Sequence, residues 1–297
     1  MKTSPSFIGS LQVIIAGICW GCLGVFSTRL GQFGFDSFAI GILRIVTAAA
    51  FALVLLPRLW RLFGKLNFAQ WQNLILQSLV GVLGMTLCYF YAVEKIGVSM
   101  AVALLYTAPI FSLVFAKILL KEIITPKAVI LALVAVVGVA CLMLGDGITL
   151  NAGIVVGLMS GLCYSLYGIL GKKAMAYDYP PALVFFSSVT ISSLVLLSLP
   201  TTWTTYQTLL TLPIDAWLLV LGLSMIGTIA PYALYMSALN KMPATKAAVF
   251  TIIEPLTAIL LAIVLLSQDI RPMQIIGIIL IVGATLFNSV QLKSKNA

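Results

Sequence analysis

Glu254 and Pro255 are the most unusual pair in the sequence, because they stand near the middle of a long apolar stretch, residues 245–266. Apart from Lys246 near one end and a few threonines, that stretch holds no other polar side chain. A charged side chain at the centre of a membrane helix costs about 2.5–3.5 kcal/mol, so it usually faces a cavity or a partner. Glu254 could bind an ammonium group or exchange a proton, or it could only hydrogen-bond neighbouring helices beside a kink at Pro255.

Arg44 is the only basic residue that falls clearly inside an apolar stretch, residues 36–57. Its guanidinium could hold a carboxylate through two parallel hydrogen bonds, which would complement Glu254 for a zwitterionic cargo. An arginine this near a helix end can instead bond loose backbone carbonyls or extend to the membrane surface, and we favour that structural interpretation.

Aromatic and proline residues mark the same apolar stretches. Tyrosines and a tryptophan at repeat-related positions, or level with mid-span prolines, are the best candidates to line a substrate pocket: Trp20, Tyr89, Tyr106, Tyr164 and Tyr235. At any single position, packing or lipid contact is the alternative. Pro109, Pro231 and Pro255 sit inside long apolar runs, where each weakens a helix, and they are candidate hinges.

Membrane-spanning helices must hold these side chains. Hydrophobic residues make up 62% of the 297 residues and charged residues only 8%, a composition typical of membrane proteins. Backbone groups find no water in a bilayer, so a spanning segment is a helix or part of a barrel, and continuous apolar runs favour helices. We therefore expect an all-α integral membrane protein with ten transmembrane helices of 19 to 24 residues, near 8–29, 36–57, 72–94, 98–118, 127–145, 152–171, 179–199, 215–238, 244–266 and 273–291.

The net charge of +9 is distributed unevenly along this arrangement. If the N-terminus is cytoplasmic, thirteen lysines and arginines lie at cytoplasmic ends and loops, and only Arg29, Lys95 and Arg271 lie on the other side. This bias predicts a multi-pass protein of the cell membrane with cytoplasmic N- and C-termini. Because it explains the charge without nucleic acid, the expected partners are the lipid bilayer and a small-molecule substrate.

The chain also repeats itself. At an offset of 144 residues, GICW at 17–20 aligns with GLCY at 161–164, and at 146 Tyr89 aligns with Tyr235 and Pro109 with Pro255. The repeat predicts two five-helix units, residues 1–148 and 149–297. Since each unit has an odd number of spans, the second must enter the membrane from the opposite side, as in the inverted repeats of secondary transporters. Duplication for a purely structural bundle is the alternative.

Other kinds of chemistry have little support. There is no histidine, no pair of carboxylates within one span and no cysteine spacing typical of a metal site, so neither an enzyme nor a metal or other cofactor is expected. No phosphate-binding loop is present, and the longest predicted loop, residues 200–214, is too short for a second folded domain. A channel would need a ring of like groups around a symmetric pore, whereas this chain offers one off-centre glutamate.

Several of these motifs together carry a family resemblance. They are AGICWG at 16–21, Arg44, YAVEKIG at 91–97, LYTAP at 105–109, LLKE at 119–122 and IEPL at 253–256. With them the chain resembles the EamA family of the drug/metabolite transporter superfamily over both halves. The resemblance implies a ten-helix carrier that opens alternately to either side and is commonly an exporter of amino acids or related metabolites. Gln268 departs from the pattern, because Glu122 occupies the related position in the first half.

Together these observations predict a secondary transporter that moves a small metabolite by alternating access, with amino acids or related metabolites as exported cargo and proton exchange at Glu254 as a further hypothesis. Uptake or exchange of a sugar, a phosphorylated or a nucleotide-linked metabolite is the alternative within transport, and it would require more buried cations than Arg44 and Lys246. A channel or a non-transporting membrane scaffold is the alternative from another class. The cargo, the direction of transport and the choice between monomer and homodimer stay open.

Overall fold

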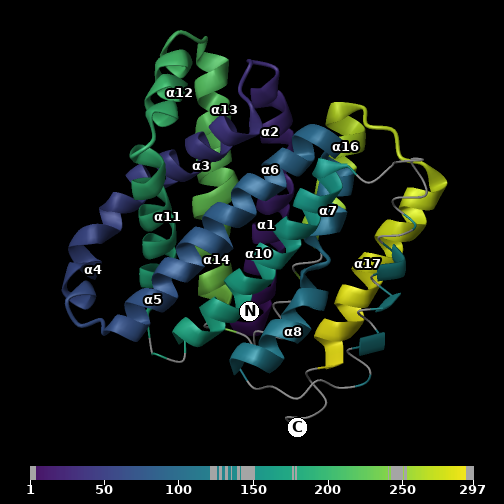
Figure 1. The fold of residues 1–297 in the computed structure, drawn as a ribbon, viewed down its shortest axis with the longest axis horizontal. Helices are drawn as coiled ribbons and strands as arrows, with labels where there is room; N and C mark the ends of the chain where they lie inside the picture. The colour runs from purple at the N-terminus through teal and green to yellow at the C-terminus, as the bar shows by residue number, and fades with distance from the viewer. Residues whose placement is uncertain are drawn as a thin grey trace.

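The structure is a computed structural model that describes residues 5–120, 151–175, 179–239 and 253–291, with separate residues between 126 and 141 and at 177, 241 and 250. Helices and short connections make up these residues. No strand occurs among these residues. The elements, shown in Figure 1, are α1 (Pro5–Gly21), α2 (Leu23–Gly31), α3 (Ser37–Ala52), η1 (Leu53–Leu55), α4 (Leu56–Phe63), α5 (Phe68–Leu76), η2 (Gln77–Gly84), α6 (Met85–Ile96), α7 (Val98–Leu105), α8 (Ala108–Leu120), α10 (Ala152–Met175), α11 (Pro181–Leu197), α12 (Pro200–Leu210), α13 (Ile214–Ser224), η3 (Met225–Ile229), α14 (Ala230–Leu239), α16 (Ile253–Leu266) and α17 (Pro272–Gln291).

Six continuous helical runs are long and apolar enough to cross a membrane, and α11 with α12 would make a seventh that is bent by 93°. The six runs are Phe7–Gly31, Ser37–Phe63, Phe68–Ile96, Val98–Leu119, Ala152–Gly171 and Ile214–Tyr235. They confirm the prediction of an all-α, multi-pass membrane protein. The described residues leave out most of the predicted span at 127–145, most of the seam between the two predicted units and Lys246. The number of ten transmembrane helices therefore stays a prediction.

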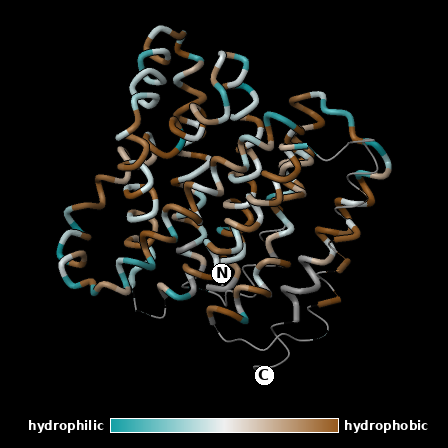
Figure 2. The backbone as a smooth tube through the Cα atoms, in the orientation of Figure 1, coloured by the Kyte–Doolittle hydropathy of each residue, from teal (hydrophilic) through white to brown (hydrophobic). Residues whose placement is uncertain are grey.

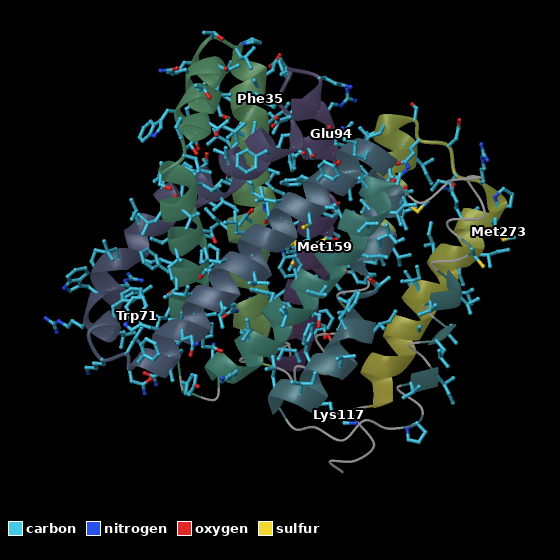
Figure 3. All side chains as sticks on the ribbon, in the orientation of Figure 1. Phe35, Trp71, Glu94, Lys117, Met159 and Met273 are labelled. Carbon is cyan, nitrogen blue, oxygen red and sulfur yellow. The ribbon has the colours of Figure 1, made fainter. Side chains whose placement is uncertain are left out.

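Polar residues gather toward the two ends of the helix bundle, and the middle is dominated by hydrophobic residues (Figure 2). Lys117 lies at one end, and Phe35 and Glu94 lie at the opposite end (Figure 3). Many large apolar side chains point outward, as Val54 and Phe68 do with 77% and 83% of their surface exposed. Such an exposed apolar surface is expected where lipid, not water, surrounds the protein.

The prediction of a loop at residues 200–214 is wrong, because most of it forms α12. Pro200 is accepted as the first helical residue, where its missing N–H costs nothing. The threonines that suggested a loop bond back to the helix itself, as Thr205 Oγ1 does to the carbonyl of Thr201 at 2.7 Å. Leu209, which is fully buried, fixes the helix against the rest of the bundle.

Helices from the first half of the chain pack against helices from the second. α1 contacts α14 and α16, α10 contacts α6, α8 and η2, and α3 contacts α11. Ser224 Oγ donates to the carbonyls of Leu43 and Arg44, at 3.5 and 3.4 Å. Ser78, at the related position 146 residues earlier, lies with its hydroxyl 3.3 Å from the carbonyl of Ser187, and its shorter bond, of 2.6 Å, is to the carbonyl of Leu74. The same kind of contact thus joins the two halves twice.

Two short π-helical segments also lie at related positions. η2 precedes α6 in the first half, and η3 precedes α14 in the second. Pro231 follows directly after η3 as the second residue of α14, and its missing N–H favours an irregular turn there. The related residue is Met85, so η2 forms without a proline. Such π-segments widen a helix and are frequent at functional sites.

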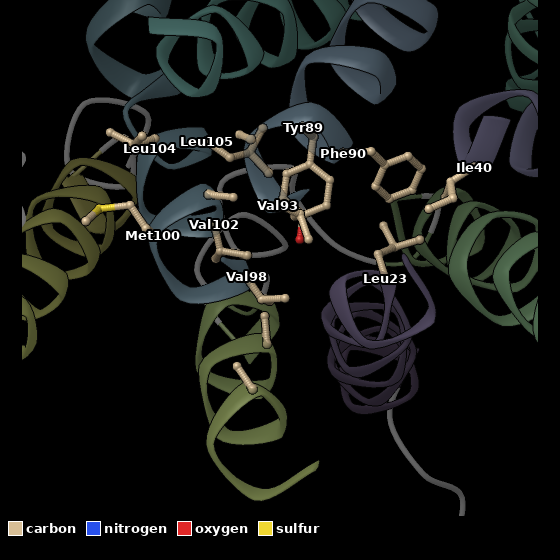
Figure 4. Close-up of a cluster of buried hydrophobic side chains, with 14 of the residues drawn as sticks. Leu23, Ile40, Tyr89, Phe90, Val93, Val98, Met100, Val102, Leu104 and Leu105 are labelled. Atoms are coloured by element: carbon tan, nitrogen blue, oxygen red, sulfur yellow. The ribbon is translucent and has the colours of Figure 1, made fainter. Parts of the chain in front are cut away.

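A large buried cluster surrounds α7 and connects it to α2, α3 and α6 (Figure 4). Every residue of α7 from Val98 to Leu105 is buried. Tyr89 and Phe90 of α6 lie in the same cluster with Leu23 of α2. This cluster holds the end of α7 firmly beside the polar centre described next.

Candidate functional site

Glu254 is the centre of the site that the structure assembles. Its side chain is buried at the beginning of α16, with 8% of the residue exposed. The hydroxyl of Tyr106 donates a hydrogen bond of 2.8 Å to Oε2 of this carboxylate. Oε1 has no hydrogen-bond partner among the described residues. Two residues 148 positions apart, both selected from the sequence as substrate-binding candidates, therefore meet.

The α1 helix lies unusually close to the residues around Glu254. A Cβ atom at Gly17 would lie 2.2 Å from Ile253 Cγ2, and one at Gly21 would lie 2.6 Å from Thr257 Cβ. The same added atom at Gly21 would lie 3.0 Å from the backbone oxygen of Glu254. Two glycines of the AGICWG motif at 16–21 thus allow α1 and α16 to pack at backbone distance.

Tyr106 occupies a break between α7 and α8. The chain turns at Tyr106 and Thr107, and the Thr107 hydroxyl bonds the carbonyl of Leu104 at 2.6 Å. Pro109 follows as the second residue of α8, so the break lies just before the predicted hinge. Pro255 is the third residue of α16 as described, directly after Glu254. Whether either proline acts as a hinge stays a prediction.

The aromatic candidates form two groups around this break. The ring of Tyr106 lies 6.5 Å from that of Tyr164 on α10, measured between centroids. Trp20 of α1 lies 5.6 Å from Tyr235 and 5.6 Å from Tyr232, both on α14. Tyr89 lies 5.6 Å from its neighbour Phe90, so all five aromatic residues predicted for the pocket are paired with another ring.

Sequence reasoning did not select Tyr232 and Tyr167, although both belong to this aromatic surface. Their rings lie 5.9 Å apart at 90°, and Tyr232 also lies 5.3 Å from Phe185. A helical-spacing argument could have found them, because each is three residues from a selected tyrosine, Tyr235 or Tyr164, on the same helix.

Arg44 is buried, with 2% of its surface exposed, and neutral groups hold it. Nε donates to the Thr228 hydroxyl at 3.0 Å and Nη1 to the Thr86 hydroxyl at 2.9 Å. The guanidinium carbon lies 5.7 Å from the centre of the Phe90 ring. Hydroxyls of two threonines, not loose backbone carbonyls or the membrane surface, hold this side chain, and Nη2 has no acceptor among the described residues. Whether Arg44 also binds substrate stays a prediction.

The buried side chains of Glu254 and Arg44 do not form an ion pair with each other. Among the described residues, the ion pair is Lys95 with Glu94, at 2.7 Å and at the end of the bundle. The site therefore contains one buried guanidinium and one buried carboxyl group, and neutral side chains hold each of them.

A second contact joins α7 and α16 at their other ends. Gln268 Oε1 accepts from both the backbone N–H and the hydroxyl of Ser99, each at 3.4 Å. Gln268 stands where the family pattern has a glutamate, and an amide oxygen serves this acceptor role as well as a carboxylate. Together with the bond between Tyr106 and Glu254, this contact ties the two antiparallel helices at both ends.

Comparison with known proteins matches both halves of the chain. A model of the EamA-like transporter family matches residues 7–144 and again residues 151–290. An uncharacterized transporter of Archaeoglobus fulgidus is 25% identical over 94% of this chain and 95% of its own length. The threonine/homoserine exporter RhtA of Escherichia coli is 24% identical over 78% of this chain and 76% of its own length. A solved crystal structure shares the fold with a TM-score of 0.55 and 18% identity, over 96% of this chain and 99% of that one.

Proposed function

This chain belongs to the EamA-like transporter family, and from that membership we propose that it exports amino acids or closely related small metabolites by alternating access. A relative named as a threonine/homoserine exporter supports this substrate class. The observation that carries the proposal is the pair of buried side chains of opposite charge type, Glu254 and Arg44, which hydrogen-bond neutral groups and form no ion pair with each other.

A zwitterion is the cargo that suits this pair of charges. Burying an unpaired charge is costly, and the cost is recovered when a ligand supplies the opposite charge with good hydrogen-bond geometry. The ammonium group of an amino acid would bind Glu254, and its carboxylate would accept from Nη2 of Arg44. Tyrosine rings would contact the side chain of the cargo, and their hydroxyls would orient its polar groups.

The binding step would also change how the helices are tied. An ammonium group that binds both oxygens of Glu254 would compete with the hydroxyl of Tyr106, which already donates to one of them. Displacing Tyr106 would free the break between α7 and α8 from α16, while Gln268 and Ser99 keep the other ends together. We take this local release as the event that lets the two halves move.

The wider architecture that we propose is ten transmembrane helices in two inverted five-helix repeats, residues 1–148 and 149–297. The double match to the family model supports it, as do the related contacts of Ser78 and Ser224 and the related π-segments η2 and η3. With both termini in the cytoplasm, the end of the bundle that holds Phe35 and Glu94 would face outward.

Transport of phosphorylated or nucleotide-linked metabolites fits less well. A phosphate group is usually held by several arginines or lysines. Arg44 is the buried basic residue among those the structure describes, and Lys246 lies outside them. One guanidinium with a facing carboxylate favours a zwitterion over a dianion.

The test is release of labelled compounds from liposomes that contain the purified protein and are preloaded with amino acids, sugars and phosphorylated metabolites. Wild type is compared with Glu254→Gln, with and without a pH gradient. We expect protein-dependent release of amino acids that Glu254→Gln reduces at least tenfold. Glu94→Gln removes a carboxylate at the end of the bundle and is the matched control. Release of phosphorylated cargo alone, or unchanged release by Glu254→Gln, would refute the proposal.

A further inference from the structure

A cavity of about 160 Å³ opens at the end of the bundle that holds Phe35, away from Glu254. It lies between the beginning of α3 and one face of α12, the helix that sequence reasoning took for a loop. Its lining is four threonines of α12 together with a short segment before and within α3: Gly34, Phe35, Asp36, Phe38, Ala39, Thr201, Thr204, Thr205 and Thr208.

Three of the four threonine hydroxyls in this cavity can only accept a hydrogen bond from a ligand. Thr204 and Thr205 each donate their single hydroxyl proton to the carbonyl of Thr201, at 3.0 and 2.7 Å. Thr208 donates in the same way to the carbonyl of Thr204 at 3.0 Å. A hydroxyl whose proton is used within its own helix has only lone pairs left to offer. A ligand of these oxygens must therefore bring the hydrogens.

The charge of the cavity agrees with this hydrogen-bonding character. Asp36 is the one charged residue in the lining, and only its Oδ1 is used, by the N–H of Ala39 at 2.7 Å. The N-terminal end of α3 carries the partial positive charge of its helix dipole. Glu94 offsets this charge, because its Oε2 accepts from the N–H of Ser37 at 3.0 Å. Lys95 in turn neutralises Glu94 through their 2.7 Å ion pair. The net charge that the cavity presents is negative.

We propose that this cavity binds a primary ammonium group, carried by a small free amine or by the head group of a phospholipid. The carboxylate of Asp36 supplies the charge, and the threonine oxygens accept the N–H bonds. Phe35 and Phe38 supply an aromatic wall that suits a cation. Trp203 and Leu210 are 58% and 70% exposed on α12, as expected of a helix at the membrane surface, so both ligand sources reach the cavity. The site does not depend on what the central site transports.

The experiment is calorimetric titration of ethylammonium into the protein in nanodiscs of phosphatidylglycerol, which has no ammonium head group. We expect saturable binding that Asp36→Asn weakens at least tenfold, because asparagine keeps the helix cap but removes the charge. Asp269→Asn, which removes an exposed carboxylate from the loop between α16 and α17, should change the affinity less than twofold. Tetramethylammonium, which has no N–H group, should bind at least tenfold more weakly than ethylammonium.

Two further comparisons test whether the amine binds in this cavity or at the central site, and whether the natural ligand is a free amine or a lipid head group. The titrations are repeated in Glu254→Gln, which removes the central carboxylate as a second ammonium site. Asp36→Asn should still weaken ethylammonium binding at least tenfold in that background, so failure of the proposed function leaves this site standing. If phosphatidylethanolamine in the nanodisc weakens ethylammonium binding, the head group is the occupant, and if it does not, a free amine is. Absence of saturable binding, equal binding by Asp36→Asn, or loss of binding in Glu254→Gln overturns the proposal.

Discussion

At the scale of single residues, the site is defined by charges that the protein does not pair with each other. Glu254 is satisfied through one oxygen by a phenol, and Arg44 through two of its nitrogens by threonine hydroxyls. These hydrogen bonds with neutral groups hold the side chains of Glu254 and Arg44 in place, and each charge stays available to a ligand. That availability is what separates a binding site from a structural ion pair.

Replacing Tyr106 with phenylalanine tests whether this hydroxyl competes with the cargo. The substitution keeps the ring beside Tyr164 and removes a bond to a charged group worth about 1.5–3 kcal/mol. We expect the transported amino acid to bind about tenfold more tightly, which corresponds to about 1.4 kcal/mol. Equilibrium binding of the labelled amino acid measures it. Tyr164→Phe is the control, and weaker binding in Tyr106→Phe would contradict the competition.

Replacing Arg44 with lysine tests recognition of a substrate carboxylate. Lysine keeps the charge, but its three N–H groups radiate from one nitrogen and cannot reproduce the planar fork with which a guanidinium bonds Thr86 and Thr228 and still meets a carboxylate. Wild type should prefer an amino acid over the amine that lacks its carboxylate by about 100-fold, and the variant by less than about tenfold. Competition against labelled amino acid measures both ratios. In Thr228→Val the arginine remains and the preference should persist; an unchanged preference in Arg44→Lys would make Arg44 purely structural.

At the scale of helices, the site depends on irregular positions in otherwise regular elements. The break at Tyr106 and Thr107 presents a phenol to α16, and η3 brings Thr228 to Arg44. α12 brings its threonines against the beginning of α3. At the break and in η3, the backbone departs from a regular α-helix at the residue that contributes its side chain to the site.

Close packing of α1 on α16 leads to a prediction with a built-in control. An alanine Cβ at Gly21 would meet Thr257 Cβ at 2.6 Å and the Glu254 backbone oxygen at 3.0 Å, so Gly21→Ala should cost about 1–3 kcal/mol of stability and lower transport. Gly168 on α10 has no atom within 4 Å of that position, so Gly168→Ala should be neutral or stabilising by up to about 1 kcal/mol. Thermal unfolding in detergent measures both, and equal effects would disprove the packing argument.

At the scale of the molecule, the amino-acid pattern predicted the membrane class, most helices and a polar centre at Glu254. Hydropathy and repeats are local signals, so they could not predict that Tyr106 meets Glu254 across 148 residues. The same apolar run suits an α-helix and a π-helix, so η2 and η3 could not be predicted either. Threonine-rich residues 200–214 resembled a loop because threonine is a weak helix former in isolation, and burial of Leu209 overrides that preference.

The interleaved packing of the two halves predicts that neither can work alone. α1 lies against α14 and α16, and α10 against α6 and α8, so separating residues 1–148 from 149–297 exposes faces that each half covers for the other. We expect the co-expressed halves to copurify and to restore amino acid release from liposomes, and each half alone to give none. Blank liposomes and the intact chain are the controls. If one half alone transported the cargo as a homodimer, the site would not need Tyr106 and Glu254 from different halves, and the proposed mechanism would fail.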